Sequence, residues 1–130
     1  MGEFSRVLKN GGAIVVTDPL APSSAHVDTW MNDVEIRRDP THVRDRTMDE
    51  WRALLENGGF ALEDFEVTKV YLEFDDWVER SATQSREIDT LRYDFTVAGA
   101  DVVSAFNIRR DNGVITFHWD VITLRGVKKG

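Results

Sequence analysis

The sequence contains no cysteine among its 130 residues. This absence excludes disulfide bonds, thiolate metal sites and cysteine nucleophiles. Basic residues are also scarce, since 16 lysines and arginines stand against 23 acidic residues and give a formal net charge of −7. Nucleic-acid binding without sequence preference needs a basic face, and a polybasic membrane anchor needs clustered cations. We therefore expect neither a nucleic-acid partner nor a membrane partner.

Long apolar runs are missing as well, because the longest unbroken one covers only residues 13–16. A membrane-spanning helix needs about 20 such residues. Residues 1–4 lack the cationic and apolar regions of a signal peptide, so we expect a cytoplasmic protein. A length of 130 residues with 42% hydrophobic and 30% charged residues fits one globular domain. We expect that domain to span residues 1–130.

The sequence does contain an alternation of strand and helix patterns. The β-branched run at 13–17 predicts a strand with both faces covered, which ends at Asp18. Thr47 and Glu50 have the spacing of a capping box, so a helix should begin after Thr47. The pair Asn112-Gly113 between apolar runs is typical of a hairpin. The expected elements, after a helix that ends near residue 9, are strand 13–17, helix 25–37, helix 48–57, strand 60–72, helix 74–80, a helix between Gln84 and Gly99, helix 100–106 and a long strand from 114 to about 124.

Motifs for nucleophilic catalysis and for phosphate binding are absent. The sequence has no Gly-x-Ser-x-Gly elbow, no P-loop and no Gly-x-Gly-x-Gly turn. Its Gly-Gly pairs at 11–12 and 58–59 each follow a predicted helix and precede a strand, the reverse of the dinucleotide-binding order. Its three histidines show none of the paired spacing of zinc ligands. We therefore expect no metal site.

His42 is the histidine with the most functional position, because it lies in a dense charged loop between Arg38 and Arg44. Loops carry binding and catalytic residues more often than the elements that they connect. The simpler interpretation is a solvated loop without a function. Sequence spacing alone favours neither interpretation strongly.

The N-terminal segment resembles a known family. EFSRVLKNGG at 3–12, followed by AIVVTD at 13–18, is similar to the E-x-x-R-V-L-K-P-G-G-x-hydrophobic segment of class I S-adenosylmethionine-dependent methyltransferases. Asn10 stands in place of the usual proline. In that family the segment contains the end of the fourth helix and the fifth strand, and many methyltransferases share it.

A second, narrower resemblance follows. RDPTHVR at 38–44, then EWRALL at 50–55 and Gly59-Phe60, resemble the branch similar to ubiquinone/menaquinone-biosynthesis methyltransferases. The two resemblances together cover almost the whole chain. They imply an α/β fold with a partial Rossmann-like sheet, made of the equivalents of strands five, six and seven, and with helical lid insertions.

The resemblance also indicates what this sequence lacks. In the family, an earlier half holds S-adenosylmethionine with a first strand, a glycine-rich turn and an acidic residue that ends the second strand. None of these has a counterpart here. The chain therefore resembles the C-terminal half of a methyltransferase, which supplies the substrate side and the lid. We expect it to bind no cofactor and to be inactive by itself, and the family implies a small-molecule methyl acceptor.

The resemblance implies a set of site residues. Asp18 would lie at the end of strand five, near the crevice where open α/β sheets bind ligands. His42 would act as a general base or hydrogen-bond the substrate, and Arg44 would anchor an anionic or carbonyl group. The alternative is that Asp39, His42 and Arg44 hold the loop against the next helix. We also expect walls of the acceptor pocket from Trp30 and Trp77.

Two other functions stay open. A chain of this size and aromatic content could form a self-sufficient α+β enzyme or ligand-binding domain, similar to SnoaL-like or nuclear-transport-factor-like domains. It could also be an association module, because the family's strand four has no counterpart here and strand 13–17 would then be an apolar edge. We therefore expect a homodimer, or a dimer that exchanges an element, with residues 1–17 at its interface. We also expect a small mixed sheet in which strands 60–72 and 114–124 are antiparallel and strand 13–17 lies beside the latter.

Overall fold

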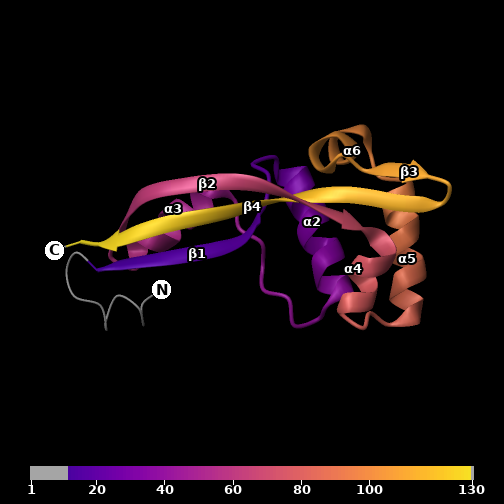
Figure 1. The fold of residues 1–130 in the computed structure, drawn as a ribbon, viewed down its shortest axis with the longest axis horizontal. Coiled ribbons are helices and arrows are strands. Elements are labelled where there is room, and N and C mark those ends of the chain that lie inside the picture. Colours follow the sequence, from indigo (N-terminus) through magenta and orange to yellow (C-terminus); the bar gives the residue numbers. More distant parts are fainter. Residues whose placement is uncertain (1–11, 130) are drawn as a thin grey trace.

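A sheet with the strand order β1-β4-β2, to which β3 adds by pairing with β4, is the centre of the fold (Figure 1). This computed structural model describes residues 12–129, so the expected helix near residue 9 lies outside the described part. The elements are β1 (Ala13–Leu20), α2 (Ala25–Arg38), α3 (Met48–Asn57), β2 (Phe60–Glu73), α4 (Phe74–Arg80), α5 (Ser85–Thr96), α6 (Ala100–Phe106), β3 (Arg109–Asp111) and β4 (Val114–Lys128).

The central strand β4 pairs antiparallel with both of its long neighbours. Its C-terminal half pairs with β1, from Leu20 opposite Asp120 to Ala13 opposite Val127. Nearly its whole length pairs with β2, with one irregularity between Leu62 and Asp64 in β2. The expected mixed sheet is therefore wrong for residues 12–129, because β1 and β2 run in the same direction but never pair with each other.

β1 is longer and more open than its sequence predicts. It continues through Asp18 and Pro19 to Leu20. Proline is tolerated in an edge strand, where one side of the backbone has no partner strand, and β1 holds such a position in the described sheet. The expected cover on both faces is also wrong, since Val15 is 63% exposed while Val16 is partly buried. One face of β1 therefore packs on the protein and the other is open.

Two local signals in the sequence are confirmed. In α3 the Thr47 hydroxyl accepts a hydrogen bond from the Glu50 backbone N–H at 3.3 Å, and the Glu50 carboxylate accepts one from the Thr47 N–H at 3.1 Å. Asn112 and Gly113 have φ values of 50° and 80°, which a two-residue hairpin with the favoured twist requires. None of the helices within residues 12–129 is both long enough and apolar enough to cross a bilayer.

The larger of two hydrophobic cores is rich in aromatic side chains. It joins α2, α4, α5 and α6 to the first half of β4 through Ile115, Phe117 and Trp119. At its centre the Trp77 ring contacts Phe117 and Trp119 with ring centroids 5.3 and 6.1 Å apart. Edge-to-face contacts of this kind add to the free energy of burial.

The smaller core lies at the other end of the sheet. Trp51 and Leu55 of α3 pack there with Phe60 and with Ile122 and Leu124 of β4. Successive side chains of a strand point to opposite faces, so the odd-numbered core residues of β4 and these even-numbered ones face opposite ways. The helices around the larger core and the helix α3 therefore cover opposite faces of the sheet.

Candidate functional site

The charged loop between α2 and α3 places His42 between two carboxylates. The His42 Nε2 atom lies 3.4 Å from Asp45 Oδ2, and its Nδ1 atom lies 3.8 Å from Glu35 Oε2. The His42 side chain is 17% exposed. Glu35 comes from the last turns of α2 and Asp45 from the end of the loop. The three side chains form what we call the Glu35–His42–Asp45 cluster.

Both carboxylates of the cluster are buried, Glu35 with 4% and Asp45 with 1% of its surface exposed. Burial is the main reason why the pKa of Asp45 is raised well above its usual value, and the charge of Glu35 raises it further. Charged groups are rarely buried without a partner, because leaving water is unfavourable for them. The cluster is therefore a place where a proton or another cation is needed.

Backbone hydrogen bonds hold Asp45 in place. Its N–H donates to Asn32 Oδ1 at 2.7 Å, and Asn32 Nδ2 donates to the Asp45 carbonyl oxygen at 3.1 Å. The same amide nitrogen donates to Asp28 Oδ1 at 2.7 Å. Earlier in the loop, Asp39 accepts hydrogen bonds from the backbone and hydroxyl of Thr41 at 3.0 and 2.7 Å. The end of the loop is thus tied to α2 through Asn32, and its start is held by a local turn.

Arg44 is engaged with carboxylates of the protein. It donates to Glu50 through Nε at 2.9 Å and through Nη2 at 2.7 Å, and Nη2 also donates to Asp28 at 2.5 Å. The Arg44 guanidinium lowers the pKa of Glu50 to about 2. These contacts join α2 to α3 across the loop, which is the holding role considered as the alternative to a substrate anchor.

Asp18 lies within the electrostatic reach of the cluster. It is half-buried in β1, and burial raises its pKa while the charges of Arg46 and His42 lower it. β1 and the loop are joined where the Ala21 N–H donates to the Arg46 carbonyl oxygen at 2.9 Å. The structure therefore joins the end of β1 to the charged loop, and the charge of His42 acts on Asp18 across this junction.

Glu35 and Asp45 are members of the cluster that the sequence reasoning missed. The available signal was that Glu35 follows Val34 and comes four residues after Met31, so it lies near the apolar stripe of α2. A glutamate beside buried positions is unusual unless it has a partner. For Asp45 no comparable signal exists, because its burial depends on how the loop folds back on α2.

The two predicted pocket walls belong to the larger core. Trp77 is 2% exposed, and Arg38 donates to its carbonyl oxygen at 2.8 Å and stacks over its ring at 4.9 Å from the centroid. Trp30 is partly buried and packs on Phe95 and Phe106, with centroids 5.0 and 5.7 Å apart. In this conformation Trp77 offers almost no surface to a ligand, which corrects the expectation of a pocket wall.

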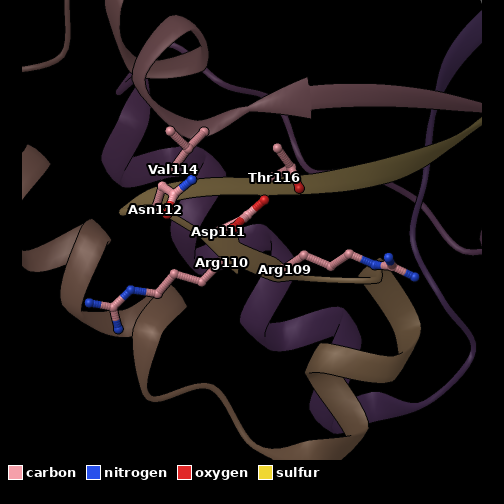
Figure 2. A pocket seen from close by; sticks show the side chains of 6 residues that line it. All are labelled: Arg109, Arg110, Asp111, Asn112, Val114 and Thr116. Atoms are coloured by element: carbon pink, nitrogen blue, oxygen red, sulfur yellow. The ribbon is translucent and has the colours of Figure 1, made fainter.

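Two hollows on the surface are relevant to the site. The larger, of about 750 Å³, lies at the β3–β4 hairpin and is lined by Arg109, Arg110, Asp111, Asn112, Val114 and Thr116. Figure 2 shows its two arginine side chains extending in opposite directions, so they do not converge on one ligand. A second hollow of about 450 Å³ includes Arg38 and Pro40 and lies between α2 and the start of α5. It borders the charged loop, but neither of these two hollows is lined by a predicted site residue.

Comparison of the sequence with known proteins finds relatives in two bacteria. The uncharacterized protein YafE of Escherichia coli is 32% identical over 109 residues, which are 84% of this chain and 53% of YafE. The uncharacterized methyltransferase YcgJ of Bacillus subtilis is 26% identical over 129 residues, which are 98% of this chain and 51% of YcgJ. The chain thus spans about half the length of the curated relatives it matches. No protein-family model matches it.

Two solved structures share the fold of this chain. BH2331 of Bacillus halodurans, a methyltransferase by its description, superposes with a TM-score of 0.93 at 28% identity, over 99% of this chain and 61% of that one. The crystal structure of YcgJ gives a TM-score of 0.92 at 26% identity, over 98% of this chain and 56% of that one. The chain is therefore similar in sequence and fold to part of proteins that are described as methyltransferases, and residues 12–129 have the α/β fold of that part.

Proposed function

We propose that this chain is the C-terminal, substrate-side part of a class I S-adenosylmethionine-dependent methyltransferase that acts on a small molecule, in the branch similar to the quinone-biosynthesis enzymes. The observation that carries the proposal is the superposition of nearly the whole chain on about 60% of two methyltransferase structures. The pairing of β4 with β2 supports it, because the antiparallel arrangement of these two strands was expected from the sequence.

The described residues do not fit the cofactor. In the family a glycine-rich turn leads from a strand into a helix, where the backbone can approach the ligand closely. Here β1 leads into α2 through Ala21, Pro22, Ser23 and Ser24, without a glycine. The turn with Gly58 and Gly59 leads from a helix to a strand instead. We therefore derive no methyl-transfer step for this chain by itself.

Within the proposed function, His42 serves the methyl acceptor when a complete active site is assembled. Transfer of a methyl group to an oxygen or nitrogen nucleophile releases a proton, which a nearby imidazole can accept. Asp18, whose pKa the charge of His42 lowers, would contact the acceptor from β1. In the present conformation both His42 nitrogens face protein carboxylates, so this role requires the imidazole or the loop to move.

The proposal has a direct test by calorimetry. The isolated chain should show no S-adenosylmethionine binding with a dissociation constant at or below about 1 µM, which corresponds to about −8 kcal/mol. Intact YcgJ serves as the positive control. A chimera that joins this chain to the part of YcgJ outside the match should recover binding. Tight binding by the isolated chain, or a chimera that folds but binds nothing, would reject the proposal.

A second proposal concerns assembly. The outer edge of β1 has no partner strand within residues 12–129, and Val15 on it is 63% exposed. Unpaired apolar edges favour pairing with another chain, and twofold homodimers are the commonest assembly. We propose that β1 pairs with a second copy of this chain when no other strand covers it.

A further inference from the structure

The Glu35–His42–Asp45 cluster contains polar atoms that have no hydrogen-bond partner. Glu35 Oε1, Asp45 Oδ2 and His42 Nε2 are all buried, and none of them makes a hydrogen bond in the described part of the chain. Buried polar atoms of native proteins are nearly always satisfied, so each exception needs an explanation. A bound cation would explain why two buried carboxylates face one imidazole.

We propose that Glu35, His42 and Asp45 bind a divalent transition-metal ion, with Zn²⁺ as the best fit. One ligand atom from each of the three residues can be chosen so that all lie within 4.8 Å of one another. An ion about 2.0–2.2 Å from every ligand holds its ligand atoms no more than about 4.4 Å apart. The Asp45 Oδ2 and His42 Nε2 atoms, 3.4 Å apart, already meet this limit.

The donor set selects among metals. Imidazole nitrogen suits Zn²⁺ and its neighbours in the first transition row, whereas Mg²⁺ and Ca²⁺ prefer sites made of oxygen alone. Two carboxylates supply the charge that balances a divalent ion. The sequence contains no cysteine, so a thiolate site is excluded. The spacing of the histidines gave no hint of this site, because two of its three ligands are carboxylates.

The surroundings hold the ligands in place. Glu35 lies on α2, and the backbone of Asp45 is fixed by both hydrogen bonds to Asn32. Arg38 lies 4.0 Å from Glu35 Oε1 and could satisfy this oxygen only weakly. Three protein ligands leave at least one coordination position open for water or a ligand, as in catalytic zinc sites. The site does not depend on the proposed methyltransferase role, and while an ion is bound the coordinating nitrogen of His42 would not be available to accept a proton from the methyl acceptor.

The test is a calorimetric titration of the metal-free, untagged 130-residue chain with Zn²⁺ alone. One ion should bind per chain, and Mg²⁺ should bind at least about 100-fold more weakly because the site contains an imidazole. Asp45→Asn should weaken Zn²⁺ binding by about 100-fold or more, since loss of even an outer-shell partner is worth 10–100-fold. Glu35→Gln should do the same.

His26→Gln is the matched control, because it removes an exposed histidine that lies 3.5 Å from Asp101 and outside the cluster. It should leave the affinity unchanged. The melting temperature gives a second measurement, since Zn²⁺ should raise it in the wild type and not in Asp45→Asn. If the wild type binds no Zn²⁺, a proton shared by the carboxylates explains the cluster and the proposal is overturned. Equal binding by the wild type and a folded Asp45→Asn variant would also overturn it.

Discussion

Arg44 donates two hydrogen bonds to the Glu50 carboxylate, from Nε at 2.9 Å and from Nη2 at 2.7 Å. Parallel contacts of this kind are among the stronger charge-assisted hydrogen bonds. Glu50 is also the second member of the Thr47–Glu50 capping box, so its carboxylate accepts hydrogen bonds both from the start of α3 and from the loop. The loop geometry and the start of α3 therefore depend on one side chain.

The Arg44–Glu50 pair predicts a dependence of stability on pH. The pKa of Glu50 is lowered from 4.5 to about 2 in the folded chain. A carboxyl group with a lowered folded pKa stabilises the fold above its unfolded pKa, and this contribution is lost as the pH falls towards the folded value. Glu50→Gln, which can still form the capping box, should be less stable than the wild type at pH 7. The difference in urea midpoint should shrink between pH 4.5 and pH 2.

Glu56→Gln, an exposed change on the same helix, is the control for general charge effects. A Glu50→Gln deficit that stays constant down to pH 2 would contradict the ionic role of Glu50.

His42→Ala should destabilise the metal-free chain by about 1–3 kcal/mol, because it leaves buried carboxylate atoms without the imidazole. Urea unfolding at pH 6 measures this loss. His26→Ala, at a side chain that is 69% exposed, should change stability by less than about 0.5 kcal/mol. Equal effects of the two alanine variants would show that the imidazole contributes nothing to the loop.

Trp77→Ala should cost about 3–5 kcal/mol, since it removes a large side chain from the centre of the aromatic core. Tyr71→Ala is the comparison, because Tyr71 is 72% exposed on β2. Chemical denaturation followed by circular dichroism measures both. A small effect at Trp77 would mean that its ring is free to serve a pocket after all.

Val15→Lys should weaken self-association, because it places a charge on the open β1 edge. Thr68→Lys puts the same charge on β2, the opposite edge of the described sheet, and should have little effect. Sedimentation velocity over a range of concentrations measures both variants. A wild type that stays monomeric at high micromolar concentration would refute the homodimer.

Local signals in the sequence predicted the elements whose chemistry is local. The Thr47–Glu50 spacing located the start of α3, and Asn112-Gly113 located the hairpin, because the stabilising contacts lie within a few residues. The end of β1 was predicted too early, because a proline such as Pro19 usually ends a strand but is tolerated at the edge of a sheet. The sequence predicted correctly that strands 60–72 and 114–124 are antiparallel. It did not predict that β1 is antiparallel to β4, since that pairing joins residues that lie about a hundred positions apart.

The same contrast between local signals and tertiary packing applies to the candidate site. His42 stood out because the loop around it is rich in charge, and the expectation that His42 and Asp18 contact a methyl acceptor stays a prediction. Glu35 had only one signal in the sequence, its position near the apolar stripe of α2, and Asp45 had none, because a carboxylate becomes informative only when it is known to be buried. For Trp77 the sequence could not distinguish a pocket wall from a core residue, and only the tertiary packing places its ring in the larger core.

β4 supplies inward-facing side chains to both cores and backbone partners to every other described strand. We therefore expect the two cores to unfold together, because loss of either core would disrupt the strand that both share. In hydrogen–deuterium exchange, the amides of β4 should be the slowest of the described chain and should exchange together, at the rate of global opening. A proteolytic cut in the charged loop between α2 and α3 would leave two fragments that remain associated, because β1 in the first fragment pairs with β4 in the second.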